Sequence, residues 1–183
     1  NVFDTSKYYK LEFDVISSNG ATLGFGGGIS DVQTTTLGRK TIYTSPSTSY
    51  LQIKRSSGVT DVVIDNVSVK EVGQNWTLGT GWSIGDGFAS LDGSVSGNSY
   101  LINSQQTAVA GKTYKIEFTI SNYTQGLIRL RAGQSSSPSF VSANGIYIDY
   151  MVATATELCR VQGQNNFIGS ISNISVKEQL PYV

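Results

Sequence analysis

The sequence has no histidine and only one cysteine, Cys159, among its 183 residues. Without histidine there is no Ser-His-Asp or Cys-His pair and no imidazole metal ligand, so the usual general base near neutral pH is missing. A single cysteine cannot form an internal disulfide, and it cannot supply the paired cysteines of a zinc site. Catalysis would have to use carboxylates, lysine or tyrosine, and the carboxylates form no recognisable pair. We therefore expect a non-enzymatic protein that is held together by packing and hydrogen bonds.

Charge is also scarce, and long apolar runs are absent. Charged residues make up 14% of the chain, and 13 basic side chains balance 13 acidic ones. This balance leaves no basic footprint for nucleic acid or an anionic membrane. No apolar run approaches the roughly 20 residues that span a bilayer. We expect no nucleic-acid partner and no membrane insertion.

An internal repeat divides the chain. Residues 7–13 match residues 112–118 at an offset of 112 − 7 = 105, and residues 64–71 match residues 171–178 at an offset of 171 − 64 = 107. A fixed period of self-similarity is typical of repeated domains. The sequence thus predicts copy one over 1–72, copy two over 73–179 and a short tail over 180–183.

The local pattern is that of β-strands. Tyr114, Ile116, Phe118 and Ile120 alternate with polar residues, which is the period of a strand with one buried face. Glycine and asparagine separate such runs, and the glycine-rich stretch 24–28 is predicted to be a flexible turn. Short strands at regular spacing favour an all-β protein with two tandem antiparallel β-sandwiches.

The first copy is shorter at its start. Residues 73–110 carry Trp76 and Trp82, and nothing before Asn1 corresponds to them. We therefore expect the first domain to be incomplete at its N-terminus and to expose apolar core. A preceding segment of a longer polypeptide, or strands donated by a neighbouring chain, would cover that surface.

Three segments carry a family resemblance: the closing strand 64–72, the tryptophan-containing segment 75–87, and the Ala-Gly-Lys-Thr-Tyr sequence at 110–114. Together they resemble jelly-roll, galactose-binding-like domains of the carbohydrate-binding-like kind, in particular the tandem copies in virion proteins of marine tailed phages.

The resemblance implies an extracellular protein on the virion surface, in a tail fibre or a capsid-attached appendage. Its partners would be a host surface glycan, other virion proteins or copies of itself. Two alternatives stay open. The domains could be structural spacers or capsid decoration without a ligand, or the chain could be a secreted bacterial carbohydrate-binding module appended to a hydrolase.

Aromatic residues are the first candidates for ligand contact, because sugar rings stack on aromatic side chains while their hydroxyls meet polar neighbours. Four aromatic residues lie among serine, asparagine, aspartate and glycine: Trp82, Tyr100, Tyr123 and Tyr147. The competing interpretation for each is packing in the core or at its rim. We expect core positions for Trp76, Tyr114 and Phe118.

Arg129 and Arg131 alternate with apolar residues, so both guanidinium groups point to one face of a strand. They could recognise the carboxylates of acidic glycans. The favoured interpretation is a solvated strand face with cross-strand charge pairs, beside Lys115 and Glu117.

Asp65 is a weak metal candidate, and no other cofactor is expected. It is two and four residues before Val67 and Val69, so in an ideally alternating strand its carboxylate would share their face and point into the core. One explanation is a structural calcium site. The favoured explanation is a bulge at Asp65 and Asn66, because copy two has Ser172 at the matching position. The closing strands are predicted to bury Val67, Val69, Ile174 and Val176 equivalently.

Overall fold

The computed structural model describes residues 3–27, 36–57, 59–134 and 138–180. Every regular element in these ranges is a β-strand, and every strand pair is antiparallel, so the predicted all-β class is confirmed. This part of the chain holds no helix that could cross a membrane. The strands are β1 (Tyr8–Ser18), β2 (Thr22–Gly26), β3 (Gly38–Thr44), β4 (Gln52–Ser57), β5 (Val62–Val72), β6 (Trp76–Leu78), β7 (Trp82–Gly85), β8 (Phe88–Asp92), β9 (Ser99–Ala108), β10 (Thr113–Arg131), β11 (Gly145–Val152) and β12 (Glu157–Gln179).

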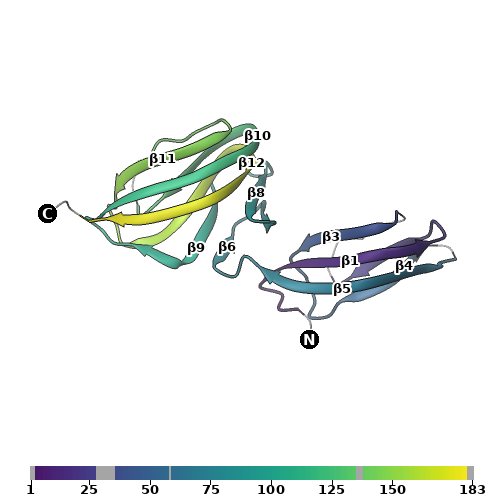
Figure 1. Ribbon diagram of the computed structural model, residues 1–183. Helices are drawn as coiled ribbons and strands as arrows, with labels where there is room; N and C mark the ends of the chain where they lie inside the picture. The colour runs from purple at the N-terminus through teal and green to yellow at the C-terminus, as the bar shows by residue number, and fades with distance from the viewer. Residues whose placement is uncertain (1–2, 28–35, 58, 135–137, 181–183) are drawn as a thin grey trace. The chain divides into compact units, whose positions relative to one another are not determined.

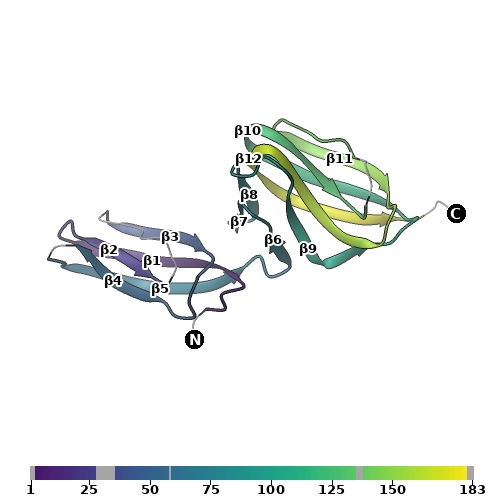
Figure 2. The ribbon, with the colours of Figure 1, turned by 180° about the vertical axis from the view of Figure 1, so that it is seen from behind.

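The strands belong to two compact units, Asn1–Gln74 and Asn75–Val183 (Figure 1). Unit 1 has a three-stranded sheet of order β3-β1-β5 and a two-stranded sheet of β2 and β4. In unit 2, β11, β10, β12, β8 and β7 follow one another in a single sheet, and β9 joins β12 to β6. Figure 2 shows β9 and β11 at opposite sides of the long strands β10 and β12.

The two units share one pairing scheme. In unit 1, β1 lies between β3 and β5, and in unit 2, β10 lies between β11 and β12. Directly opposed residues recur at the offsets of the sequence repeat, 105 on the central strand and 107 on its two neighbours. The opposed residues are Leu11 with Ile42 and Val69 in unit 1, and Ile116 with Asp149 and Val176 in unit 2. The sequence repeat is therefore also a repeat of strand register.

The shared scheme extends to the two-stranded sheet of unit 1. Phe25 of β2 opposes Ile53 of β4, and Leu130 of β10 opposes Val161 of β12, so β2 and β4 correspond to the outer halves of the two long strands. In unit 2 the corresponding segments are joined, because β10 is one strand that bends between Ser121 and Leu127 and stays paired with β12. The register of the two strands shifts at this bend. The ladder of β10 and β12 thus combines in one sheet the pairings that unit 1 divides between its two sheets.

The glycine-rich stretch of unit 1 corrects one prediction. Residues 24–26 belong to β2, and Phe25 is fully buried, with its ring centroid 5.0 Å from that of Phe13. The predicted flexible turn is wrong for these residues because the aromatic side chain fixes them to the core. A left-handed backbone begins at Gly27, with φ of 94°, and Gly28 lies outside the described residues.

Each unit has its own apolar core. In unit 1, Leu11 and Phe13 of β1 are fully buried beneath β2, and Phe3 is buried with them. The expectation that copy one exposes its core is wrong for these residues, because Phe25 of β2 and Phe3 pack against the aromatic side chains of β1. In unit 2, Tyr114 and Phe118 are buried as predicted, and Trp76 packs partly buried against the core.

The only cysteine is part of the unit 2 core. Cys159 of β12 is 2% exposed. Burial raises the pKa of its thiol to about 11. A buried, protonated thiol behaves as a small apolar side chain rather than as a nucleophile.

A bulge in the closing strand of unit 1 breaks its alternation. Asn66 has φ of 52°, and opposite it the register of β1 shifts between Glu12 and Asp14. Val67, the next residue, is 46% exposed, which corrects the prediction that it is buried. Unit 2 repeats the feature at Asn173, with φ of 52°. The three other predicted positions face the core: Val176 is buried, and Val69 and Ile174 are partly buried against it. Val67 and its counterpart Ile174 are therefore not equivalent.

The bulge of unit 1 predicts an acid-sensitive contact. Asp14 accepts a hydrogen bond of 2.8 Å from Nδ2 of Asn66 and pairs at 3.1 Å with Arg39. The Asn66 bond, helped by Arg39, lowers the pKa of Asp14 below its usual 3.8. A lowered folded-state pKa gives stability that is present above pH 3.8 and is lost as the pH falls through the folded-state value.

We therefore expect Asp14→Asn to reduce the difference in melting temperature of unit 1 between pH 7 and pH 3. Thermal unfolding followed by calorimetry measures this difference. Unit 2 is the internal control, because the residue that corresponds to Asp14 is Thr119, which carries no charge. An unchanged difference in the variant would contradict the prediction.

Candidate functional site

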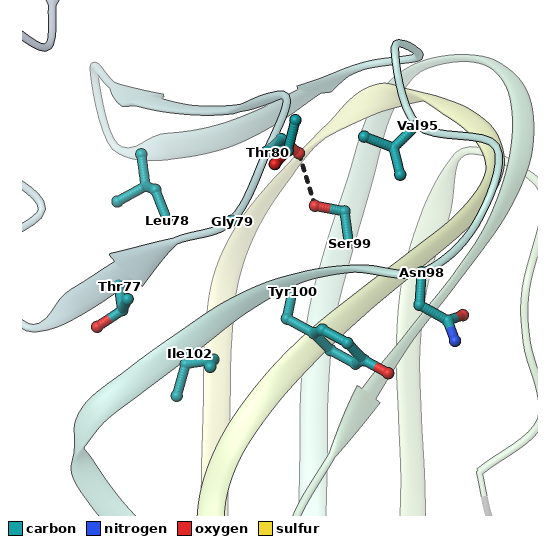
Figure 3. A pocket seen from close by; sticks show the side chains of 9 residues that line it. All are labelled: Thr77, Leu78, Gly79, Thr80, Val95, Asn98, Ser99, Tyr100 and Ile102. Atoms are coloured by element: carbon teal, nitrogen blue, oxygen red, sulfur yellow. Dashed lines mark hydrogen bonds between the residues drawn. The ribbon is translucent and has the colours of Figure 1, made fainter.

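A shallow hollow lies where β6 meets β9. Its volume is about 450 Å³, which falls within the range of small-molecule sites. Tyr100 supplies an aromatic ring, and threonine, serine and asparagine supply polar groups (Figure 3). The residues that line it are Thr77, Leu78, Gly79, Thr80, Val95, Asn98, Ser99, Tyr100 and Ile102.

The alternation of β9 decides which side chains face outward. Ser99 and Leu101 are buried, and the Ser99 hydroxyl donates a 2.6 Å hydrogen bond to the Thr80 carbonyl. Figure 3 shows Asn98, Tyr100 and Ile102 on the other side of the strand. Tyr100 is partly buried, so its ring is held in place while part of it stays accessible.

A polar row continues from Tyr100 across the sheet. Tyr100 lies opposite Gln162 of β12, which lies opposite Arg129 of β10. Gln162 is only 3% exposed, and its Oε1 accepts hydrogen bonds from Nε of Arg129 at 3.0 Å and Nη1 of Arg131 at 3.2 Å. Its Nε2 donates to Oδ1 of Asn98 at 2.8 Å. One buried amide therefore orients two guanidinium groups and one side chain of the hollow.

A third arginine completes a cationic surface, which we call the arginine face (Arg129, Arg131 and Arg160). Arg160 lies directly opposite Arg131 and forms an ion pair with Glu157. Burial, together with the neighbouring charge of Arg131, lowers the pKa of Arg129. The face therefore brings together three guanidinium groups, and Glu157 forms an ion pair with one of them.

Aromatic rings support two of these guanidinium groups. The guanidinium carbon of Arg129 lies 4.2 Å from the ring centroid of Phe140, and that of Arg160 lies 5.7 Å from the centroid of Tyr100. Both distances are within the range of cation–π contacts. The rings therefore help to hold these arginines over the sheet.

The structure brings together three of the six predicted ligand-contact residues, Tyr100, Arg129 and Arg131. Trp82 is 6% exposed inside the unit 2 core, so its assignment as a ligand contact is corrected: its indole fills the core beside Leu91 and Gly163 and cannot stack on a sugar.

Tyr123 and Tyr147 lie away from the arginine face. Each is partly buried against the core, Tyr123 near Phe167 and Tyr147 stacked on Phe118 with ring centroids 5.4 Å apart. Their hydroxyl groups donate to backbone carbonyls, those of Gly126 and Ala143 respectively. These contacts correspond to the packing interpretation of both residues.

The expected neighbours of the two arginines are also corrected. Lys115 and Glu117 form an ion pair at 3.5 Å on the part of β10 that precedes its bend. Lys115 lies opposite Lys177 of β12. The bend of β10 separates that part of the strand from Arg129 and Arg131, whose shared partner is the neutral Gln162.

Asp65 does not point into the core. Its side chain is exposed, and its Oδ1 accepts the Asn66 backbone N–H at 2.7 Å. This is the bulge geometry favoured from the sequence. Among the described residues no cluster of acidic, cysteine or histidine side chains could hold a metal ion, so Asp65 gives no support to a calcium site.

Four residues that connect the hollow with Arg129 and Arg131, or that hold these arginines in place, were not found from the sequence: Asn98, Phe140, Arg160 and Gln162. Gln162 and Arg160 are two residues apart in β12 and so share a face, which is a usable signal. Their position opposite Arg129 and Arg131 depends on the strand register. Phe140 reaches the site because its neighbour Val141 forms an isolated β-bridge with Ile128 of β10. No local sequence pattern predicts that bridge.

Comparison of the chain with models of known protein families finds no match, and comparison with curated proteins finds none either.

Proposed function

We propose that this chain is a non-enzymatic adhesion protein of a virion surface, part of a phage fibre or appendage, that binds a host glycan through the hollow beside Tyr100. Each unit would be a β-sandwich of the jelly-roll, galactose-binding-like class, and the units would be tandem copies. The register of β1 with its neighbours β3 and β5 matches the register of β10 with its neighbours β11 and β12, and this match supports the relationship.

The observation that carries the glycan proposal is the composition of the hollow. A partly accessible tyrosine ring lies beside hydroxyl and amide side chains in a space of about 450 Å³. Sugars need this mixture, because their rings have apolar faces while their hydroxyls require hydrogen-bond partners. The absence of histidine from the sequence supports the non-enzymatic part of the proposal.

Tyr100→Ala should weaken binding to whichever oligosaccharide a glycan array identifies by about tenfold, equivalent to about 1.4 kcal/mol. The expected cause is loss of the stacking surface. Titration calorimetry with the full chain measures the affinity. Tyr150→Ala is the matched control, because Tyr150 is a 56% exposed tyrosine on β11 of the same unit.

Equal losses in the two variants would contradict the site. Absence of binding to any glycan by the folded chain would contradict the adhesion function and favour the spacer alternative. Release of reducing ends from a polysaccharide would contradict the non-enzymatic assignment and favour a hydrolase.

A further inference from the structure

We infer that the arginine face recognises an anionic group, a carboxylate or a sulfate ester, on the glycan that occupies the neighbouring hollow. The inference rests on the proposed function, because the hollow would hold the sugar ring to which the anion is attached. Tyr100 and Asn98 connect the two: both line the hollow, Tyr100 contacts Arg160, and Asn98 bonds to Gln162.

The first argument is an uncompensated charge. Arg131 and Arg160 are directly opposed across the ladder of β10 and β12, an arrangement that destabilises a sheet when the charges are alike. Glu157 neutralises Arg160. Within the described part of the chain, Arg131 forms no ion pair, and its hydrogen-bond partner is the neutral Gln162. An external anion would relieve this repulsion.

The second argument is that the guanidinium groups are held in place before any ligand arrives. Gln162 bonds to two of them and is itself buried and bonded to Asn98. Phe140 lies under Arg129, and Glu157 holds Arg160. Fixed arginines lose little conformational entropy when they bind an anion, so more of the interaction energy becomes affinity.

The third argument comes from the other unit. The residues that correspond to Arg129 and Arg131 at the offset of 105 are Gly24 and Gly26 of β2, which hold equivalent places in the ladder with β4. Unit 1 completes the same layer with glycines at both positions. The shared framework therefore does not require arginine there, and a role outside folding accounts for these side chains.

The chemistry selects the class of ligand. Planar guanidinium groups form paired hydrogen bonds with carboxylate, sulfate and phosphate oxygens. A glycan is favoured over a nucleic acid because the net charge of the chain is zero, whereas nucleic-acid binding uses many backbone phosphates along a basic track.

The test measures the affinity of the full chain by titration calorimetry for three oligosaccharides of equal length: an oligogalacturonate, a sulfated oligogalactose and a neutral oligogalactose. Arg131→Gln is the test variant. Arg55→Gln is the matched control, because it removes one charge from an exposed position on β4 and leaves the arginine face intact. NMR signals of the arginine side chains during titration with inorganic sulfate report on the anion site alone.

We expect one acidic oligosaccharide to bind at least about tenfold more tightly than the neutral one, and the preferred one identifies the anion. Arg131→Gln should remove this preference, since it deletes a charged hydrogen bond to the anion. Arg55→Gln should change neither affinity.

Equal affinity for acidic and neutral sugars would overturn the inference while leaving the proposed function intact. An acidic preference that survives Arg131→Gln, or tighter binding of a single-stranded oligonucleotide than of either acidic sugar, would also overturn it. Sulfate-induced shifts in a chain that binds no glycan would support the anion site and contradict the proposed function.

Discussion

Phe13→Ala should unfold unit 1 and leave unit 2 folded. Phe13 is fully buried against Phe25, and removing a buried phenylalanine side chain costs about 3–5 kcal/mol. A domain of this size has a total stability of similar magnitude. Because each unit has a core of its own, the loss should be confined to one unit. Calorimetry should show one missing transition, and hydrogen exchange should show lost protection in β1 to β5.

Two further variants control this result. Phe118 is the counterpart of Phe13 in unit 2, at 118 − 13 = 105, so Phe118→Ala should affect unit 2 and spare unit 1. Ile16 lies on the same strand as Phe13 but is 54% exposed, so Ile16→Ala should change stability by less than about 0.5 kcal/mol. A single transition that shifts as a whole in either phenylalanine variant would show that the units do not unfold separately.

Gly126→Ala should destabilise unit 2 by about 3–5 kcal/mol. Gly126 lies at the bend of β10 with φ of 83°, a backbone conformation that residues with a Cβ rarely adopt. A Cβ at this position would lie 2.3 Å from Cα of Phe167. The obstacle is backbone of the opposing strand β12, so relief requires the two long strands to separate. Urea unfolding followed by fluorescence or circular dichroism measures the loss.

Gly111→Ala separates the clash from the backbone strain. Gly111 has φ of 82°, and nothing lies within 4 Å of a Cβ built there. Its substitution should therefore cost only the left-handed conformation, about 1–2 kcal/mol. If both variants lost the same free energy of unfolding, the contact between the new Cβ at position 126 and the Phe167 backbone would have been relieved while the bend of β10 was kept.

The sequence predicted the inner strands of both units because they follow one simple rule. Tyr114, Ile116 and Phe118 alternate without interruption, and burial follows that alternation residue by residue. Because the repeat aligns residues 112–118 with residues 7–13, the same strand could be predicted in unit 1. Val67 was assigned wrongly because strict alternation was applied across the expected bulge at Asp65 and Asn66. Its counterpart Ile174 follows the same kind of bulge and does pack against the core, so the local pattern does not distinguish the two positions.

The candidate site was only partly predictable because its contacts join distant segments. Arg129 and Arg131 were correctly assigned to one face, which is a local property of a strand. Their partner Gln162 lies 33 and 31 residues away, and its place opposite Arg129 depends on register shifts in β10 that no local pattern encodes. Trp82 was misassigned for the converse reason: its polar sequence neighbours are not its neighbours in space.

The buried thiol of Cys159 makes the chain convenient for site-specific labelling. Thiol reagents attack the thiolate, and a side chain that is 2% exposed with a pKa of about 11 offers very little of it at neutral pH. The sequence contains no other cysteine. A cysteine introduced at an exposed position such as Ser142 would then be the one reactive thiol of the folded protein, and a fluorophore could be attached there without replacing the native cysteine.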